Sequence, residues 1–250
     1  MRYVAMFILI LWGFSTSSVE AALKVADLKD REAVIEYASQ TGDWAYLTRL
    51  SMLLADEKAR GDAAPLPHYY SALAAYRAAE IDEDVELRVG VLLDRCIDQT
   101  KAALKLRPEW SEALALAGAC HGLAARRQPL SALIAGNFAA RELKQALVIN
   151  PENPRAMLLQ AVTLLRRFED ADRVELARQL LVDAVAQFES FPPPTMDGGP
   201  SWGEEHAHFW LAHVASLKRD KSTARNHLEQ ALLIAPDLKI AQVSLAQIGR

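Results

Sequence analysis

Apolar residues recur every three or four positions along most of the 250-residue chain. The pattern is clearest in three segments, where Ala, Leu and Ala follow one another at spacings of four and three. These segments contain Ala139, Leu143 and Ala146; Ala177, Leu181 and Ala184; and Ala224, Leu228 and Ala231. Such spacings put each set on one face of a helix. Because alanine is small, we expect a second helix to pack closely against that face.

A short phrase ends several of these stretches. It reads Ala-Leu-x-[Leu/Ile]-x-Pro and occupies residues 103–108, 146–151 and 231–236, with a degenerate copy starting at Ala184. Proline lacks an N–H and cannot continue a helix, so each complete copy predicts a helix end. Asn153 followed by Pro154 predicts the start of the next helix, because asparagine is a frequent N-cap and proline suits the first helical position.

The rest of the chain also has a helical character. Strong helix formers dominate after residue 22, and no stretch alternates polar and β-branched residues as a strand would. Glycine and proline cluster between the helical stretches. The predicted helices span 24–40, 44–61, 66–80, 84–106, 109–126, 129–149, 153–168, 171–190, 203–219, 221–235 and 237–247.

This pattern resembles the tetratricopeptide-repeat family, whose 34-residue helix–turn–helix unit has small residues in both helices and a terminal proline. Counting back from Pro236 puts matching residues at Leu211, Ala212, Ala224, Leu228 and Ala231, while His208 stands where the family has an aromatic residue. The likeness is closest over 203–236, extends to 109–151 and is irregular elsewhere. It implies an all-α, right-handed α-solenoid of about five antiparallel helix pairs with a C-terminal capping helix.

The chain divides into three parts under this interpretation. Residues 1–21 form a signal peptide, 22–108 form degenerate N-terminal helical repeats, and 109–250 form the repeats that resemble the family. A Pro/Gly-rich loop at 191–202 interrupts the last part, and it is either a functional loop or a plain insertion. The pattern Ser201-x-x-Glu204 at its end is a capping box, which predicts that a helix starts there.

The resemblance also implies a concave groove lined by the first helix of each unit. The residues at the matching positions are Glu112, Arg155, Leu158, His206, Phe209 and His213, with Ser216 beyond them. Such a groove suits a peptide or a partner helix. For Leu158 and Phe209, packing between units is an equally good interpretation. Trp44, Trp110, Trp202 and Trp210 are expected to be packing anchors near helix starts.

The first 21 residues have the pattern of a secretory signal. Arg2 precedes an uncharged apolar run from Tyr3 to Phe14, and small residues follow up to Ala21. The run has the length of a signal-peptide core and is short for a membrane span. We therefore expect a periplasmic or secreted protein with no stable membrane span after signal cleavage; the alternative is an uncleaved N-terminal anchor.

The two cysteines, Cys96 and Cys120, have two interpretations. In an oxidising compartment they could form a disulfide. The sequence favours the other interpretation, a free, buried residue at each position, because both lie in Ala/Leu-rich helices. Neither belongs to a CxxC motif, which argues against a redox or zinc motif.

Several function classes are disfavoured. The formal net charge is −4 and no dense Lys/Arg run is present, so nucleic-acid binding is not expected. There is no G-x-S-x-G motif and no Gly-rich phosphate loop, so we predict no catalytic residues and no cofactor. His206, His208 and His213 share one predicted helix at spacings that cannot chelate an ion without another helix, so no metal site is predicted.

These observations predict an exported interaction scaffold that binds a peptide or partner protein in its concave groove. The alternative is a small-molecule-binding protein, or an accessory helical-repeat subunit of an exported enzyme or envelope complex.

Overall fold

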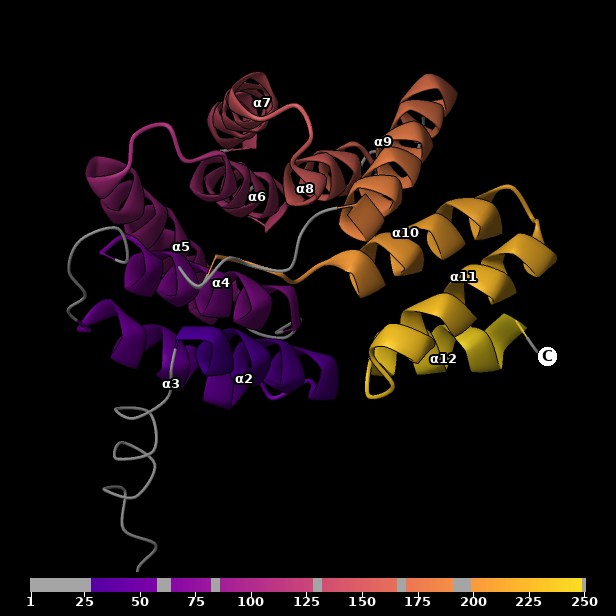
Figure 1. Ribbon diagram of the computed structural model, residues 1–250, viewed down its shortest axis with the longest axis horizontal. Coiled ribbons are helices and arrows are strands. Elements are labelled where there is room, and N and C mark those ends of the chain that lie inside the picture. The colour runs from indigo at the N-terminus through magenta and orange to yellow at the C-terminus, as the bar shows by residue number, and fades with distance from the viewer. Residues whose placement is uncertain are drawn as a thin grey trace, which may run out of the picture.

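The computed structural model describes residues 28–57, 64–81, 86–127, 132–165, 170–190 and 199–248, which form eleven helices and no strand. The predicted signal peptide and residues 191–198 of the predicted loop lie outside the described residues. The helices are α2 (Leu28–Thr41), α3 (Trp44–Ala55), α4 (Leu66–Ile81), α5 (Glu86–Leu106), α6 (Ser111–Arg127), α7 (Ala132–Ile149), α8 (Pro154–Leu165), α9 (Ala171–Ser190), α10 (Glu204–Leu217), α11 (Lys221–Ile234) and α12 (Lys239–Ile248) (Figure 1).

Successive helices form five pairs, namely α2/α3, α4/α5, α6/α7, α8/α9 and α10/α11, and α12 packs on the last of them. The pairs follow one another around an arc, so that α12 comes to lie beside α2 (Figure 1). At this junction the ammonium group of Lys239 donates a hydrogen bond to the carbonyl oxygen of Thr41. The prediction of an all-α solenoid of five helix pairs with a C-terminal capping helix is confirmed. The division of the chain at residue 108 stays a prediction.

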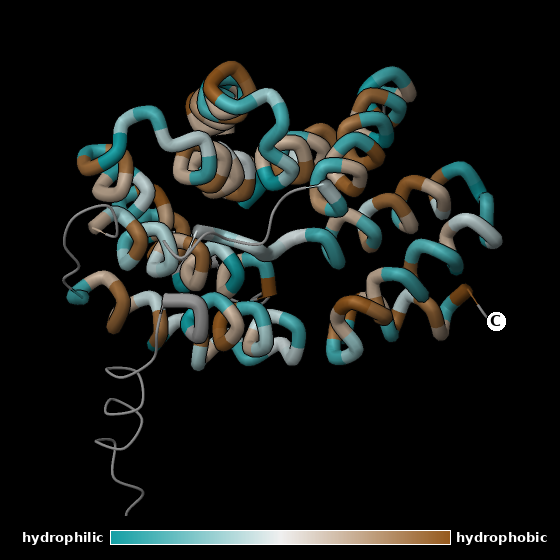
Figure 2. Tube along the Cα trace, in the orientation of Figure 1, coloured by the Kyte–Doolittle hydropathy of each residue, from teal (hydrophilic) through white to brown (hydrophobic). Residues whose placement is uncertain are grey.

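The Ala-Leu-Ala stripes form the seams within the pairs. Among the residues of α9, those that are buried are Ala177, Leu181 and Ala184. In α11 they are Ala224, Leu228 and Ala231. Teal and brown positions alternate along both helices (Figure 2). The sequence pattern therefore identified the packing face of these helices correctly.

The even-numbered helices α2, α4, α6, α8 and α10 lie on the inner side of the arc, where each contacts the next. Helix α4 is buried on nearly every side, from Leu66 to Ala79. Because it has neighbours in α2, α3, α5 and α6, it carries no polar outer face. The inner helices are thus placed to present side chains to the middle of the molecule.

Some helix ends differ from the prediction. Helix α3 ends at Ala55, short of the predicted residue 61. The residues after Leu54 are good helix formers, but they include no large apolar side chain that a longer helix could bury. Helix α8 begins as predicted, because Asn153 Oδ1 accepts hydrogen bonds from the backbone N–H groups of Arg155 and Ala156 at 2.9 and 3.0 Å.

The predicted capping box at Ser201 is wrong. Helix α10 begins at Glu204, and its N-cap is Gly203 with φ +118° and no side-chain cap. A side chain at position 203 would meet Phe188 and Leu158, and the positive φ also favours glycine. Ser201 instead hydrogen-bonds to Glu32 of α2. A contact between segments far apart in the sequence therefore replaces the local cap.

A disulfide joins Cys96 of α5 to Cys120 of α6, with Cα atoms 6.1 Å apart. Both residues are fully buried. Of the two interpretations from the sequence, the structure has the paired one. Within the described ranges, no helix is long and apolar enough to cross a membrane.

Candidate binding site on the inner surface

The inner surface of the arc is partly covered by the chain itself. The segment 199–203, which leads into α10, runs across the inner side next to α4 (Figure 1). The backbone N–H of Ser201 donates to Glu32 Oε1 at 2.8 Å, and the Ser201 hydroxyl donates to the same oxygen. Glu32 Oε2 accepts from the Tyr70 hydroxyl at 3.1 Å. Helices α2 and α4 therefore hold the main chain of this segment through one carboxylate.

Trp202 anchors the segment. Its indole N–H donates to the Tyr69 hydroxyl at 3.0 Å, and the guanidinium carbon of Arg77 lies 4.8 Å from the centre of its ring. Its carbonyl oxygen accepts from Arg155 Nη1 at 3.5 Å. The side chain is only 4 % exposed. As the sequence indicated, Trp202 is a packing anchor, and here it combines apolar burial, a cation–π contact and a hydrogen bond.

Two of the predicted groove residues form a buried ion pair beneath this segment. Arg155 Nε and Nη2 donate to the two carboxylate oxygens of Glu112 at 2.9 and 2.8 Å. Burial opposes the charge on Arg155, but Glu112 outweighs that effect and raises the pKa of Arg155. Leu158 is also buried. All three residues lie under the chain's own segment or within the core, so their role as partner contacts stays a prediction.

A second ion pair joins α2 to α4. Arg77 Nε and Nη2 donate to the two oxygens of Glu36 at 3.2 and 3.1 Å, and Nη1 donates to Glu80 at 3.1 Å. Burial raises the pKa of Glu36 above its ordinary value of 4.5, and the charge of Arg77 opposes this shift. The guanidinium therefore compensates two carboxylates and also stacks on Trp202.

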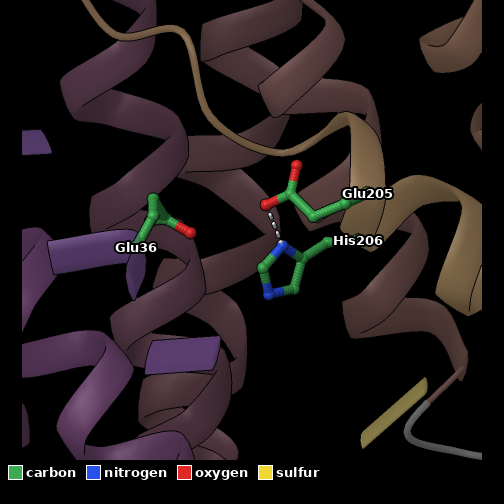
Figure 3. A group of neighbouring side chains, drawn as sticks. All are labelled: Glu36, Glu205 and His206. Carbon is green, nitrogen blue, oxygen red and sulfur yellow. Dashed lines mark hydrogen bonds and ion pairs between the residues drawn. The ribbon is translucent and has the colours of Figure 1, made fainter. Parts of the chain in front are cut away.

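Glu36 faces Glu205 and His206 at the start of α10 (Figure 3). Glu205 Oε1 and His206 Nδ1 are 2.7 Å apart, and the potential ligand atoms of all three residues lie within 4.8 Å of one another. Burial would raise the pKa of Glu205, but His206 and Arg77 outweigh it and hold that pKa at about 2. Two carboxylates and an imidazole form a donor set that suits a divalent cation. Arg77 already occupies both oxygens of Glu36, so in this structure the group is an ion network that ties α10 to α2 and α4.

A cavity of about 490 Å³ opens at the C-terminal end of the arc, between α10, α11 and α12, and we call it the end pocket. It contains two of the predicted groove residues, Phe209 and His213. Its lining consists of Phe209, Ala212, His213, Ser216, Arg219, Lys221, Leu228, Ser244, Gln247 and Ile248.

The end pocket has an apolar and a charged portion. Phe209 and Leu228 belong to the small core that α10, α11 and α12 share. Arg219, in the turn between α10 and α11, and Lys221, the first residue of α11, are exposed at its edge. The carboxylate of Asp220 between them accepts from the Thr223 backbone N–H at 3.0 Å and caps α11. The edge therefore presents the two cationic side chains, while the Asp220 carboxylate between them is already hydrogen-bonded to the backbone of α11.

The sequence missed part of both sites. It assigned α12 only a capping role, whereas Ser244, Gln247 and Ile248 of that helix line the end pocket. It also did not place Glu32, Tyr69 or Arg77 at the inner surface. The available signal was the pairing of Trp202 with a Pro/Gly-rich loop, which marks an aromatic residue delivered by a non-helical segment.

No family model and no curated protein matches the sequence. Several solved structures are similar, including the following two. One is TTC0263, a thermophilic TPR protein of Thermus thermophilus, with a TM-score of 0.51 and 17% identity over 82% of this chain and 98% of that chain. The other is the HusA haemophore from Porphyromonas gingivalis, with a TM-score of 0.54 and 23% identity over 82% of this chain and 95% of that chain. These similarities show that the chain has the fold of tetratricopeptide-repeat proteins.

Proposed function

We propose that this chain, which has the tetratricopeptide-repeat fold, is an exported, non-catalytic interaction scaffold that binds a segment of a partner protein in the end pocket. The observation that carries the proposal is the pocket itself. A volume of about 490 Å³ is within the range of ligand sites. Its lining joins an apolar wall to polar side chains and two cations, so a peptide with an apolar side chain followed by an acidic group suits it.

The segment 199–203 supports a peptide as the occupant. It is a non-helical stretch of polypeptide bound on the inner side of the arc, and its main chain bonds to Glu32 and Arg155 while Trp202 fills a buried site. Recognition of an extended peptide commonly combines main-chain hydrogen bonds with a pocket for one side chain. The chain thus holds its own segment in a manner that a partner segment could repeat at the end pocket.

Export is supported by two features. The first 21 residues have the composition of a cleaved signal, and a disulfide joins Cys96 to Cys120. Disulfides persist mainly in oxidising compartments. We therefore propose a periplasmic or secreted location, which the mass of the protein isolated from the exported fraction would test. A mature chain starting at residue 22 supports the proposal, and an intact residue 1 contradicts it.

A second candidate is small-molecule binding in the same pocket. HusA, which has a similar fold, is a haemophore, so another protein with this fold binds a small molecule. His213 and Phe209 would supply a polar and an aromatic contact for such a ligand. Titration with haem, followed by absorbance, separates this candidate from peptide binding.

Peptide selection on the immobilised chain 22–250 tests the main proposal. We expect enrichment of peptides that pair an apolar with an acidic residue. Ser244→Trp fills the pocket and should abolish binding, and Lys221→Glu should weaken it by about tenfold, because a favourable charge becomes repulsive. Arg225→Glu is the matched control, since it reverses an exposed charge of the same helix outside the pocket. Unchanged peptide affinity in Ser244→Trp would overturn the assignment of the pocket.

A further inference from the structure

Two histidines from different helices meet in the C-terminal unit. His208 lies on α10 and His227 on α11, and their Nδ1 atoms are 3.2 Å apart. The ring centroids are 5.4 Å apart, so the Nδ1 edges are the parts of the rings that face each other. Both residues are partly buried at the seam between the two helices. The histidines of α10 cannot chelate an ion by themselves, and this contact brings a histidine from a second helix, α11.

The separation of the two nitrogens matches the spacing of ligands on a metal ion. Histidine nitrogens bind Zn²⁺ at about 2.0–2.1 Å in tetrahedral geometry, which puts two of them roughly 3.3 Å apart. The same distance also fits one N–H···N hydrogen bond between neutral rings. When an ion binds, the ring that carries its proton on Nδ1 takes the Nε2–H tautomer, so that both Nδ1 atoms offer a lone pair while each ring stays neutral.

The surroundings favour uncharged rings. Burial, with His227 adding to it, lowers the pKa of His208, and burial lowers the pKa of His227. The neutral imidazole is the form that binds metals.

We propose that His208 and His227 bind one divalent transition-metal ion, such as Zn²⁺, through their Nδ1 atoms. Water completes the coordination. Imidazole nitrogen is a donor that zinc accepts. The ion would link α10 to α11. This site is independent of the end pocket and of the proposed function.

Calorimetric titration of the untagged chain 22–250 with Zn²⁺ tests the site. We expect one ion per chain, and His208→Gln and His227→Gln should each weaken binding by at least about tenfold. Glutamine keeps a hydrogen-bonding side chain at the seam, and circular dichroism of each variant checks that the helices remain. Zn²⁺ should also raise the melting temperature of the wild type but not of His227→Gln.

His206→Gln is the control that separates this site from the network of Glu36, Glu205 and His206. It should bind Zn²⁺ like the wild type. If His206→Gln alone loses the ion, the ion binds at the inner network and the proposal is wrong. It is equally wrong if the wild type binds no Zn²⁺, or if both His208→Gln and His227→Gln bind it unchanged.

Discussion

Glu36 and Glu205 show how the same side chain acquires opposite properties within one cluster. Both carboxylates are buried, yet burial raises the pKa of Glu36, whereas His206 and Arg77 overcome burial at Glu205 and lower its pKa to about 2. When folding lowers the pKa of a carboxyl group, the group stabilises the protein at pH values above its pKa in the unfolded chain, and this stabilisation is lost as the pH falls. When folding raises the pKa, the group stabilises the protein at pH values below its pKa in the unfolded chain, and this stabilisation is lost as the pH rises.

The first prediction is that Glu205→Gln reduces the free energy of unfolding by on the order of 3 kcal/mol at neutral pH and by little near pH 2. The wild-type carboxylate must be protonated as the pH falls from about 4.5 to about 2, so its advantage over glutamine is lost in that window. Urea unfolding of both proteins across this range measures the difference. Glu152→Gln, in an exposed turn, is the control for removing a carboxylate outside the cluster. A pH-independent effect of Glu205→Gln would contradict the assignment.

At the scale of the helix, the close approach of two helices depends on where a glycine, which has no side chain, lies between them. Gly118 of α6 lies against α7, where a Cβ would come within 2.7 Å of Leu143 Cγ and 3.2 Å of the Ala139 carbonyl oxygen. Gly136 of α7 has nothing within 4 Å of the same position. The two glycines thus differ only in what surrounds them, and they form a matched pair.

We predict that Gly118→Ala costs about 1–3 kcal/mol of unfolding free energy, because α6 and α7 must move apart to accept the methyl group. Gly136→Ala should gain about 0.5–1 kcal/mol, since alanine loses less backbone entropy in a helix. Chemical denaturation of both variants gives the two values. Equal effects of the same sign would show that the spacing of α6 and α7 does not depend on Gly118.

The packing of helices follows from the sequence because its cause is local. Ala224, Leu228 and Ala231 share a face by spacing alone, and they are the buried residues of α11. The inner site could not be predicted in the same way. The capping pattern at Ser201 is correct for an isolated helix, but Glu32, far away in the sequence, binds that serine instead. Spacing within one helix also could not reveal that His227 faces His208.

For the whole molecule, segment 199–203 connects parts that pairwise stacking leaves apart. Trp202 contacts Tyr69 and Arg77 of α4, and Ser201 contacts Glu32 of α2, while α10 begins directly afterwards. The C-terminal helices are therefore held to the N-terminal ones across the inside of the arc as well as along it.

We predict that Trp202→Ala lowers the free energy of unfolding by about 3–5 kcal/mol and increases the radius of gyration, because the arc loses its internal connection. Denaturation and small-angle X-ray scattering measure the two effects. Trp202→Phe keeps a ring against Arg77 but loses the hydrogen bond to Tyr69 and part of the buried ring system, so it should cost less, about 1–3 kcal/mol, and leave the scattering unchanged. If Trp202→Ala scatters like the wild type, the stacking of helices alone sets the curvature of the arc.

The hydrogen bond between Glu32 and Ser201 spans 169 positions of sequence, which sets an order on folding. Contacts between distant residues form slowly, since a long loop must close before they provide any stabilisation. Helices α2 to α8 can pair with their neighbours as the chain is made, but the inner sides of α2 and α4 stay exposed until residue 201 has left the ribosome. During that interval Glu32, Tyr69 and Arg77 lack the contacts that Ser201 and Trp202 provide, so the unfinished chain has a different inner surface from the finished protein.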